Sequence, residues 1–547
     1  MREFIKKLIF MSFAFFFFIG FESVHASDEL PSLYLETPQS PFVERNLWQD
    51  GKSSMTGNED SFENVDVRVR GRGNDTWVSY PDKRPLRLRF SEARSMLGSE
   101  YEARNWILLA NYADRSLLRN YAALGFANNL GGIGYSFLLE NIHLYVNGEY
   151  MGVYMLTDER EVHEGRLRIE ESENPAESGF FIELDARAPQ DGTLDETYVI
   201  VDGLAYDIAF PDYTPEHIGY VKNYLQTASD AISNGTFEEI CKVIDLDSFI
   251  DFYIVQELFK NADVHNLSVF MYIDGVGDER RLFMGPVWDF DTAAGNRTTQ
   301  LLGNDEEDLY VAVFNDWYRH LMNRSAFFDL VVERWNNVKN TAIPQTINDV
   351  KQVAEAYRMG FERNFEKYTF DGMSVAAQSD EILAIKDFMG QVEFLTDWIE
   401  TRAAWLDTYF NDNFVGYASL QALLDYYTFE KPITVIFEEE EQNFDYSPII
   451  LCDRTMLTVE DTAKMFNMDV KYDYDKQEVH FNGNGIEIIH RVGQKTFIIN
   501  GEVSETKFPS VIINGQIFVH LYIINIATEY TASWQTDTGF LKIYKEN

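Results

Sequence analysis

The sequence predicts an α+β protein in two parts, a large mixed domain followed by a small duplicated α+β module. Between residues 32 and 412, stretches with the period-two alternation of strands are interspersed with stretches of helical spacing. From residue 430 onward, a strand-rich unit occurs twice. The chain is 45% hydrophobic and 15% aromatic, so it has the material for packed cores and is not a disordered protein.

Residues 1–26 have the order of a secretory signal peptide. A basic leader with Lys6 and Lys7 precedes an apolar run from Leu8 to Gly20, and small residues end at Ala26. The alternative is an uncleaved membrane anchor, but the run falls short of the roughly 20 residues that a spanning helix needs. Cleavage after Ala26 would leave a secreted or cell-surface protein with no transmembrane segment.

The charge and the cysteine content narrow the class of protein. The formal net charge is −43, so the long-range field of the protein would repel nucleic acid and anionic membranes. We therefore expect no nucleic-acid partner. Only Cys241 and Cys452 are present, and they fall in different parts of the chain, so the sequence predicts no disulfide framework.

The large domain begins with strands. Residues 65–90 alternate charged and apolar side chains around the glycine-rich stretch 71–75, which predicts a strand, a glycine loop and a second strand. A short buried strand at 106–110 is followed by a helix over 116–130, with a cap near Asp114 or Ser116. The Asn-Gly pair at 147–148 between two apolar runs predicts a hairpin, and residues 179–185 predict a further strand.

The second half of this domain is predominantly helical. Residues 215–258 have helical spacing, and residues 245–248 can cap a second helix that runs toward Lys260. A strand pair is expected at 268–273 and 282–288, and residues 305–411 are mostly helical.

The C-terminal part carries an internal repeat at an offset of 62 residues. Residues 448–457 align with 510–519, and residues 470–472 align with 532–534. A chance alignment of apolar strands is the alternative, but turn and aromatic positions match as well as apolar ones. Such a unit buries its apolar face by packing on its twin.

Two polar stretches outside the expected core are candidates for chemistry. In the first, Asp263 is followed by Asn266, and in the second an apolar strand leads to Asp289 and Asp291. One acid that accepts a hydroxyl proton, together with an amide and acids that hold a divalent cation, is what phosphoryl transfer requires. The alternative is that these residues are caps and surface turns. We interpret His265 as a local hydrogen-bond partner and leave it out of the site.

Basic residues of this acidic chain are concentrated around the glycine loop. They are Arg68, Arg70, Arg72, Lys83, Arg84, Arg87 and Arg89. A glycine loop allows backbone amides to approach phosphate, and fixed cations on strands neutralise its charge. The alternative is that the arginines pair with acids on a neighbouring strand.

Several motifs together resemble the CotH kinase family of spore-coat and secreted proteins, over about residues 32–412. They are Arg70-Gly71-Arg72-Gly73-Asn74-Asp75-Thr76-Trp77 with Lys83-Arg84-Pro85, Asn105-Trp106-Ile107-Leu108-Leu109-Ala110-Asn111-Tyr112-Ala113-Asp114-Arg115-Ser116, Tyr145-Val146-Asn147-Gly148-Glu149-Tyr150-Met151-Gly152-Val153-Tyr154, and Gly285-Pro286-Val287-Trp288-Asp289-Phe290-Asp291. The resemblance implies an atypical protein-kinase-like fold that uses ATP with Mg²⁺ or Mn²⁺ to phosphorylate protein Ser or Thr hydroxyls.

The resemblance also implies roles for individual residues. Asp263 would be the catalytic acid, and Asn266, Asp289 and Asp291 would hold the metal. Lys83, Arg84, Arg72 and Gly73 would bind the nucleotide. The family's usual Lys-Lys-Pro is Lys83-Arg84-Pro85 here, so either cation could face the phosphates. The usual Leu-Thr-Glu is Leu156-Thr157-Asp158-Glu159.

The C-terminal repeat, residues 430–547, resembles the copper amine oxidase N-terminal-like domain, an appended module in many secreted proteins. His480, His490 and His520 lack metal-ligand spacing, so we expect no metal there. The module would bind a cell-wall or surface partner. Two functions follow: an exported protein kinase that acts on a protein substrate and on itself, or a non-catalytic assembly protein of a spore, wall or cell surface on a kinase-like scaffold.

Overall fold

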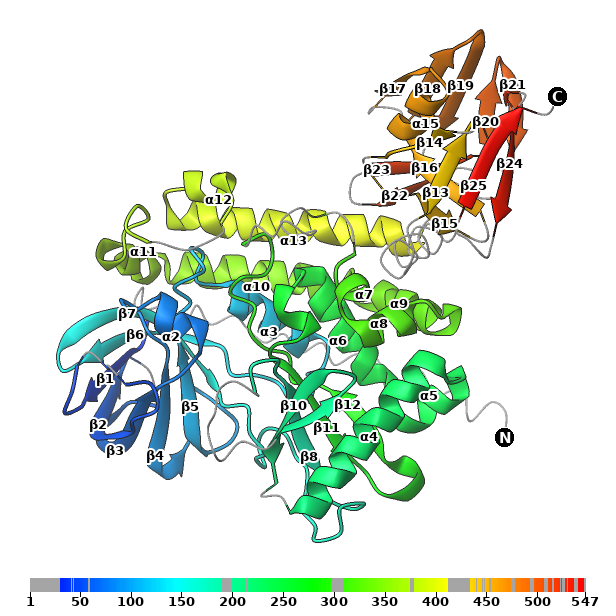
Figure 1. The fold of residues 1–547 in the computed structure, drawn as a ribbon. Coiled ribbons are helices and arrows are strands. Elements are labelled where there is room, and N and C mark those ends of the chain that lie inside the picture. The colour runs from blue at the N-terminus through cyan, green and yellow to red at the C-terminus, as the bar shows by residue number, and fades with distance from the viewer. Residues whose placement is uncertain are drawn as a thin grey trace, which may run out of the picture.

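The computed structural model describes residues 30–411 and 433–545 with short gaps. The gaps are residues 41, 43, 58–59, 189–197, 212–213, 297–305, 307–308, 374–377, 439, 445, 447, 452–453, 474–477, 492–495, 506–509, 514–515, 522, 524–526, 529 and 536–539. The predicted signal peptide lies outside the described residues. Within them, no helix combines the length and the apolar character needed to cross a membrane. The α+β prediction is confirmed (Figure 1).

Seven strands of the N-terminal half form a closed barrel in the order β1-β2-β3-β4-β5-β7-β6. Their bounds are β1 (Ser32–Glu36), β2 (Gln49–Thr56), β3 (Phe62–Gly71), β4 (Leu86–Arg94), β5 (Ala103–Leu109), β6 (Glu140–Val146) and β7 (Glu149–Asp158). The alternation of β3 places Val67 and Val69 in the barrel core, so Arg68 between them lies on its outer face. The predicted strand, glycine loop and strand are confirmed, with a short helix α2 (Asp75–Ser79) after the loop.

Helix α3 (Arg119–Asn129) begins later than predicted. The residue at its N-cap is Leu118, which provides no side-chain cap. The Asp114 carboxylate instead accepts hydrogen bonds from the N–H groups of Ser116 and Arg119, at 2.9 and 2.7 Å. Asp114 therefore stabilises the turn that leads into the helix, and the predicted start at Ser116 is wrong for that reason.

A second sheet has the order β12-β11-β8-β10-β9. Its strands are β8 (Phe180–Leu184), β9 (Tyr198–Val201), β10 (Leu204–Phe210), β11 (Val269–Asp274) and β12 (Arg281–Met284). Strand β12 is shorter than predicted and ends before Pro286, which has no N–H for a sheet hydrogen bond. Residues 285–291 consequently form a loop and not the end of a strand.

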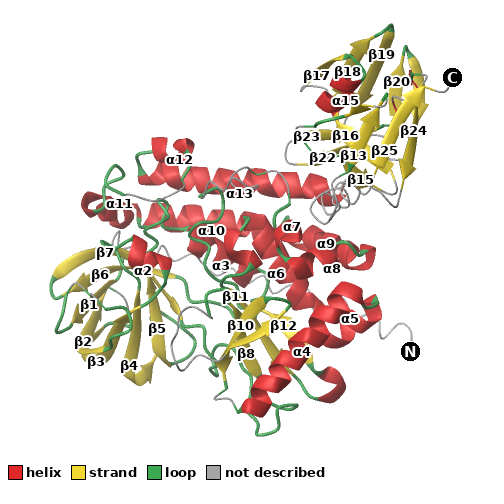
Figure 2. Ribbon diagram, in the orientation of Figure 1, coloured by secondary structure: helices red, strands yellow, loops and turns green. Residues whose placement is uncertain are grey.

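Helices pack on this sheet and along one side of the barrel (Figure 2). The predicted helical stretch 215–258 is three helices, α4 (Pro215–Asn234), α5 (Phe237–Val243) and α6 (Leu246–Phe259). Asp245 caps α6 as predicted, because its carboxylate accepts from the N–H of Ser248 at 2.8 Å. The later helices are α7 (Val311–Phe314), α8 (Asp316–Met322), α9 (Ser325–Val338), α10 (Ala342–Ala356), α11 (Arg358–Lys367), α12 (Asp380–Ala384) and α13 (Phe388–Asn411).

The C-terminal module has a hydrophobic core of its own. Its elements are β13 (Thr434–Phe437), β14 (Glu440–Glu441), β15 (Ile449–Leu451), β16 (Arg454–Thr458), α15 (Val459–Met465), β17 (Asp469–Asp473), β18 (Glu478–Gly483), β19 (Ile486–Arg491), β20 (Thr496–Ile499), β21 (Glu502–Glu505), β22 (Val511–Ile513), β23 (Gln516–His520), β24 (Tyr530–Gln535) and β25 (Phe540–Lys545). The hairpins β15–β16 and β22–β23 come from the two repeats. They pair through β16 and β23, where Leu457 lies opposite Val519, the residue that the repeat equates with it.

Candidate active site

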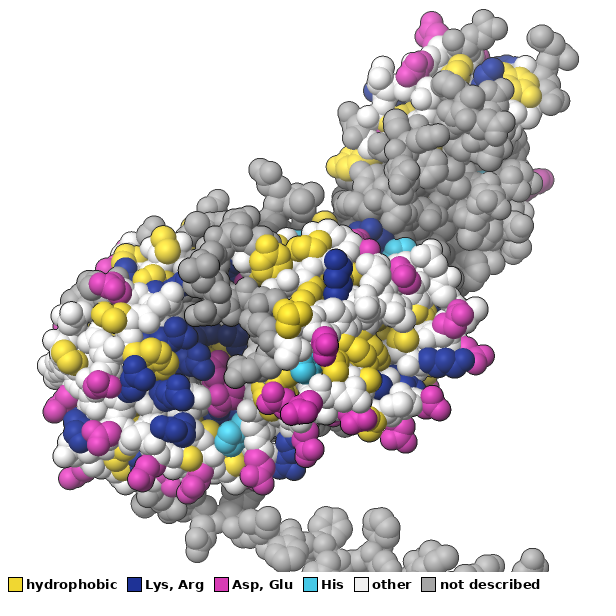
Figure 3. Space-filling model, turned by 60° about the horizontal axis from the view of Figure 1, so that its bottom comes forward, with side chains coloured by type: hydrophobic (Ala, Val, Ile, Leu, Met, Phe, Trp, Pro, Cys, Tyr) yellow, Lys and Arg dark blue, Asp and Glu magenta, His cyan; other side chains and the backbone are white. Residues whose placement is uncertain are grey.

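A cleft of about 920 Å³ lies between the barrel and the second sheet. Figure 3 shows Lys and Arg side chains gathered on one side of a hollow, with acidic side chains beside and within it. Seven of the eight predicted site residues line this cleft: Arg72, Gly73, Lys83, Asp263, Asn266, Asp289 and Asp291. Their elements are far apart in the sequence, so the fold brings the basic and the acidic stretches together.

Lys83 is buried in the wall of the cleft. Only 1% of the residue is exposed, and among the described residues its Nζ has no hydrogen-bond partner. The ammonium lies 5.1 Å from the ring centroid of Tyr154 and 5.6 Å from that of Tyr368. Burial lowers the pKa of Lys83 to about 7, and the negative charge of Asp114 opposes this shift. The protein therefore holds a desolvated cation at the position where an anion would be neutralised.

The same two tyrosines fix the backbone on either side of Lys83. The Tyr154 hydroxyl donates to the carbonyl of Arg84 at 3.1 Å, and the Tyr368 hydroxyl donates to that of Asp82 at 3.2 Å. Gly152 allows the lysine stem to pass, because a Cβ there would lie 3.1 Å from Lys83 Cε and its φ is +98°.

Arg84 does not line the cleft. Its guanidinium donates to the carbonyls of Trp77 and Phe42 at 3.1 and 2.7 Å, and it stacks on the Trp77 ring at 4.5 Å. Arg84 thus joins helix α2 to the segment between β1 and β2, and of the two neighbouring cations only Lys83 faces the site.

Arginines and one glutamate surround Lys83 on the basic wall. Arg72 stacks on Trp288 at 5.4 Å, and burial, followed by the charge of Arg160, lowers the pKa of Arg72 to about 10. Glu159 pairs with Arg87 at 2.7 Å. Burial by itself would raise the pKa of Glu159, but the charges of Arg87 and the neighbouring arginines outweigh it and hold this pKa below its usual value.

Of the two acids in Leu156-Thr157-Asp158-Glu159, Glu159 faces the cleft. Asp158 points elsewhere and forms a buried ion pair with Arg166 at 2.8 Å. Asp158 therefore stabilises the barrel through its ion pair, and Glu159 is the acid of this motif that lines the site.

The loop that carries Asp263 follows helix α6 directly. Asn261 accepts from the Asp263 N–H at 3.2 Å and so caps the short 3₁₀ helix η1 (Ala262–His265). The ring of His265 bonds to the Ala262 carbonyl at 2.9 Å, which agrees with its interpretation as a local partner. The Oδ1 of Asn266 is buried and, in the part of the chain that the structure describes, has no hydrogen-bond partner.

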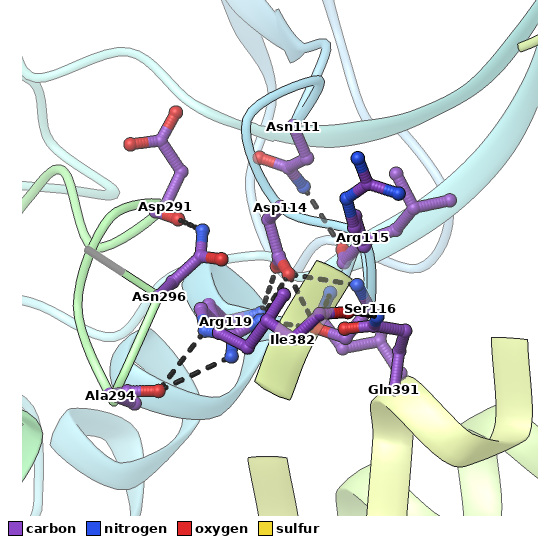
Figure 4. A network of polar contacts seen from close by, with 12 residues as sticks. Asn111, Asp114, Arg115, Ser116, Arg119, Asp291, Ala294, Asn296, Ile382 and Gln391 are labelled. Atoms are coloured by element: carbon purple, nitrogen blue, oxygen red, sulfur yellow. Dashed lines mark hydrogen bonds and ion pairs between the residues drawn. The ribbon is translucent and has the colours of Figure 1, made fainter. Parts of the chain in front are cut away.

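The opposite loop presents Asp289 and Asp291 on either side of a buried phenylalanine. Phe290 packs edge-on against Phe259 at 5.8 Å, so the carboxylates before and after it face the cleft. In Figure 4 the Asp291 carboxylate points away from Asn296, whose amide donates to the Asp291 backbone carbonyl at 2.6 Å. Burial, reinforced by the negative charges of Asp289 and Asp263, raises the pKa of Asp291 well above its usual value.

These donors suit a hard divalent cation. Among the described residues the Asn266 Oδ1 lacks a hydrogen-bond partner, and the negative charges of Asp289 and Asp263 help to raise the pKa of the Asp291 carboxyl. The described residues contain no group of three His, Cys, Asp or Glu side chains placed to enclose a metal. Magnesium, however, commonly takes one or two carboxylates and completes its shell with water and substrate phosphates. The residues therefore fit Mg²⁺ or Mn²⁺ bound together with a phosphate ligand.

Sequence reasoning missed a buried polar network behind the acidic loop (Figure 4). Asp114 pairs with Arg119 at 2.6 Å, and both side chains are fully buried. Arg119 donates to the carbonyls of Ala293 and Ala294, while Asn120 accepts from the N–H of Phe290. The signal was available, because Arg119 and Asn120 interrupt the apolar pattern of the predicted helix.

Comparisons with known proteins identify the family of this chain. A comparison with curated proteins found no match to the chain. Residues 436–543 match the copper amine oxidase N-terminal domain. Residues 67–406, more than half of the chain, match the CotH kinase protein family. The chain therefore belongs to the CotH kinase family and carries a copper amine oxidase N-terminal domain at its C-terminal end.

Proposed function

We propose that this protein is an exported atypical kinase that transfers the γ-phosphate of ATP to Ser or Thr hydroxyls of proteins, its own chain included. Membership of the CotH kinase family implies an atypical kinase that uses ATP and acts on protein substrates. One observation carries the proposal: the Lys83 ammonium, which has no hydrogen-bond partner among the described residues, lines the same cleft as the carboxylates of Asp263, Asp289 and Asp291.

The basic wall is suited to the triphosphate. The Lys83 ammonium has already lost its water, so a phosphate oxygen would gain a charge-assisted hydrogen bond without further desolvation of the lysine. Arg72 adds a second, half-buried cation, and Gly73, with φ +81°, supplies backbone without a side chain. Net repulsion from the acidic chain is overcome by these cations at short range.

The acidic wall is suited to the transfer itself. Asp263 would accept the proton of the attacking Ser or Thr hydroxyl. The hydroxyl oxygen would then bond to the γ-phosphorus of ATP while the bond from that phosphorus to the β–γ bridging oxygen breaks, with ADP as the leaving group. Asn266, Asp289 and Asp291 would hold the divalent cation, which when bound neutralises charge on the phosphates.

The test is transfer of label from γ-labelled ATP, with Mn²⁺, to the protein itself and to a Ser/Thr-containing acceptor. We expect Asp263→Asn to reduce transfer by about two orders of magnitude or more while ATP binding persists. Asp278→Asn, in the exposed turn between β11 and β12, is the matched control and should transfer normally. Binding of ATP without transfer by the unchanged protein would instead support a non-catalytic scaffold.

Export is the remaining part of the proposal, and it rests on the leader sequence. Expression of the full chain in a secreting bacterial host should release a product whose first residue is Ser27. Deletion of residues 1–26 should keep the protein inside the cell. A product that stays in the membrane fraction with Met1 intact would show an anchor in place of a cleaved signal.

A further inference from the structure

The backbone of Asp289 adopts a conformation that needs support. Its φ is +66°, in the left-handed region that residues with a Cβ rarely enter. Such a conformation is unfavourable and persists only where the surroundings impose it. The Phe290 N–H belongs to the peptide group that follows Asp289, so a hydrogen bond to it fixes ψ of Asp289 and holds the backbone at this residue.

Asn120 supplies that support from helix α3. Its Oδ1 accepts the N–H of Phe290 at 2.8 Å, and its Nδ2 donates to Asn111 Oδ1 at 2.9 Å. Asn111 in turn donates to the Leu117 carbonyl at 3.1 Å. The orientation of the Asn120 amide is thus fixed at both ends, and only 3% of the residue is exposed.

The rest of the loop is held by other groups, so the contact of Asn120 is specific to Asp289. Arg119 holds the carbonyls of Ala293 and Ala294, at 3.0 and 3.2 Å, on the far side of Asp291. Phe290 is fully buried and cannot follow a rotation of the peptide. On the cleft side, among the residues that the structure describes, the Asp289 carboxylate accepts one long hydrogen bond, from the Ser268 hydroxyl at 3.5 Å.

We propose that Asn120 is a positioning residue: by bonding the Phe290 N–H it fixes the peptide group after Asp289 and so holds the backbone that places the Asp289 carboxylate in the cleft, toward the divalent cation of bound ATP. This inference deepens the proposed function and rests on it. Groups that orient a metal ligand in this way typically contribute about ten- to a hundredfold to metal affinity.

The experiment measures the Mn²⁺ concentration that gives half-maximal ATP binding to the full-length protein, by calorimetry. We expect Asn120→Leu, which has a similar volume but no polar atoms, to raise it at least about tenfold. Asn120→Asp keeps an acceptor for the Phe290 N–H and should restore much of the metal affinity. The readout is ATP binding and not turnover, so the result does not depend on whether the protein is catalytically active.

Asn128→Leu is the matched control. Asn128 lies on the same helix and also bonds a loop backbone, through the N–H and carbonyl of Phe137, both at 2.8 Å. It should lower the melting temperature comparably but leave the Mn²⁺ dependence unchanged. If Asn120→Leu does not fold, Asn120→Ser removes the same contact with a smaller change and should show the same rise.

Two results overturn the inference, and they are distinguishable. If the unchanged protein binds ATP in a Mn²⁺-dependent way and Asn120→Leu behaves like Asn128→Leu, Asn120 is only a structural residue and the proposed function stands. If the unchanged protein binds no ATP with or without Mn²⁺, the proposed function and the inference fail together.

Discussion

The Lys83 ammonium lies over the ring of Tyr154, 5.1 Å from its centroid, and the hydroxyl of that tyrosine bonds the backbone next to the lysine. The ring's negative face replaces part of the hydration that burial removes, without supplying a hydrogen-bond acceptor. Lys83 is therefore held in place and still has its hydrogen-bonding capacity available for a ligand.

ATP binding should take up protons above neutral pH. Because burial lowers the pKa of Lys83 to about 7, the amine of the free protein is mostly neutral at about pH 8. A bound phosphate favours the ammonium and raises this pKa, so a proton must enter on binding. Calorimetry in buffers of different ionisation enthalpy should show this uptake at about pH 8 and much less at about pH 6. Equal heats in all buffers at both pH values would contradict the shift.

Lys83→Met should stabilise the protein when no nucleotide is bound. The folded-state pKa of about 7 lies below the ordinary 10.5, so between these values the unfolded state binds more protons and the lysine's contribution to stability rises with pH. Below about pH 7 the full penalty for the buried charge applies. The Lys83→Met substitution removes this charge and should raise the free energy of unfolding by a few kcal/mol at about pH 6 and by little above about pH 10.5. Denaturant titrations at several pH values, with Lys222→Met on the surface of α4 as control, measure this.

Lys83→Ala and Arg84→Ala should affect different properties. The first removes the cation that faces the cleft, so ATP binding should weaken by up to a few kcal/mol. The second removes the Trp77 stacking and two hydrogen bonds to backbone carbonyls, so stability should fall by about 1–3 kcal/mol with a smaller effect on ATP affinity. A nucleotide titration and a thermal melt on each variant separate the two effects. Stronger impairment of ATP binding by Arg84→Ala would show that the glycine loop, and not Lys83, governs affinity.

Deletion of residues 430–547 should leave ATP affinity unchanged. Every described residue that lines the cleft lies between Arg45 and Phe314, and the C-terminal module has its own core. The truncated protein should instead lose attachment to cell-wall or surface material in a pull-down with the unchanged protein as reference. Loss of ATP binding by a truncated protein that retains its helical circular dichroism would show that the module contributes to the site.

Local patterns predicted most of the elements. Period-two alternation located β3 and β4, the Asn147-Gly148 turn located the β6–β7 hairpin, and Asp245 located the start of α6. Errors occurred where a distant partner or a single residue overrode the pattern. Strand β12 ends before Pro286, which cannot donate a sheet hydrogen bond. Helix α3 begins only at Arg119, because the Asp114 carboxylate bonds the turn that precedes it.

The sequence by itself determined which chemical groups the site contains, because acids, amides and clustered cations are visible as residue types and spacings. Only the tertiary structure decided which of them meet. Lys83 and Arg84 are neighbours of like charge, yet Tyr154 and Tyr368 lie under the first and Trp77 lies under the second. Asn120 and Phe290 are 170 residues apart, and their hydrogen bond depends on how helix α3 packs against a loop, which no local pattern encodes.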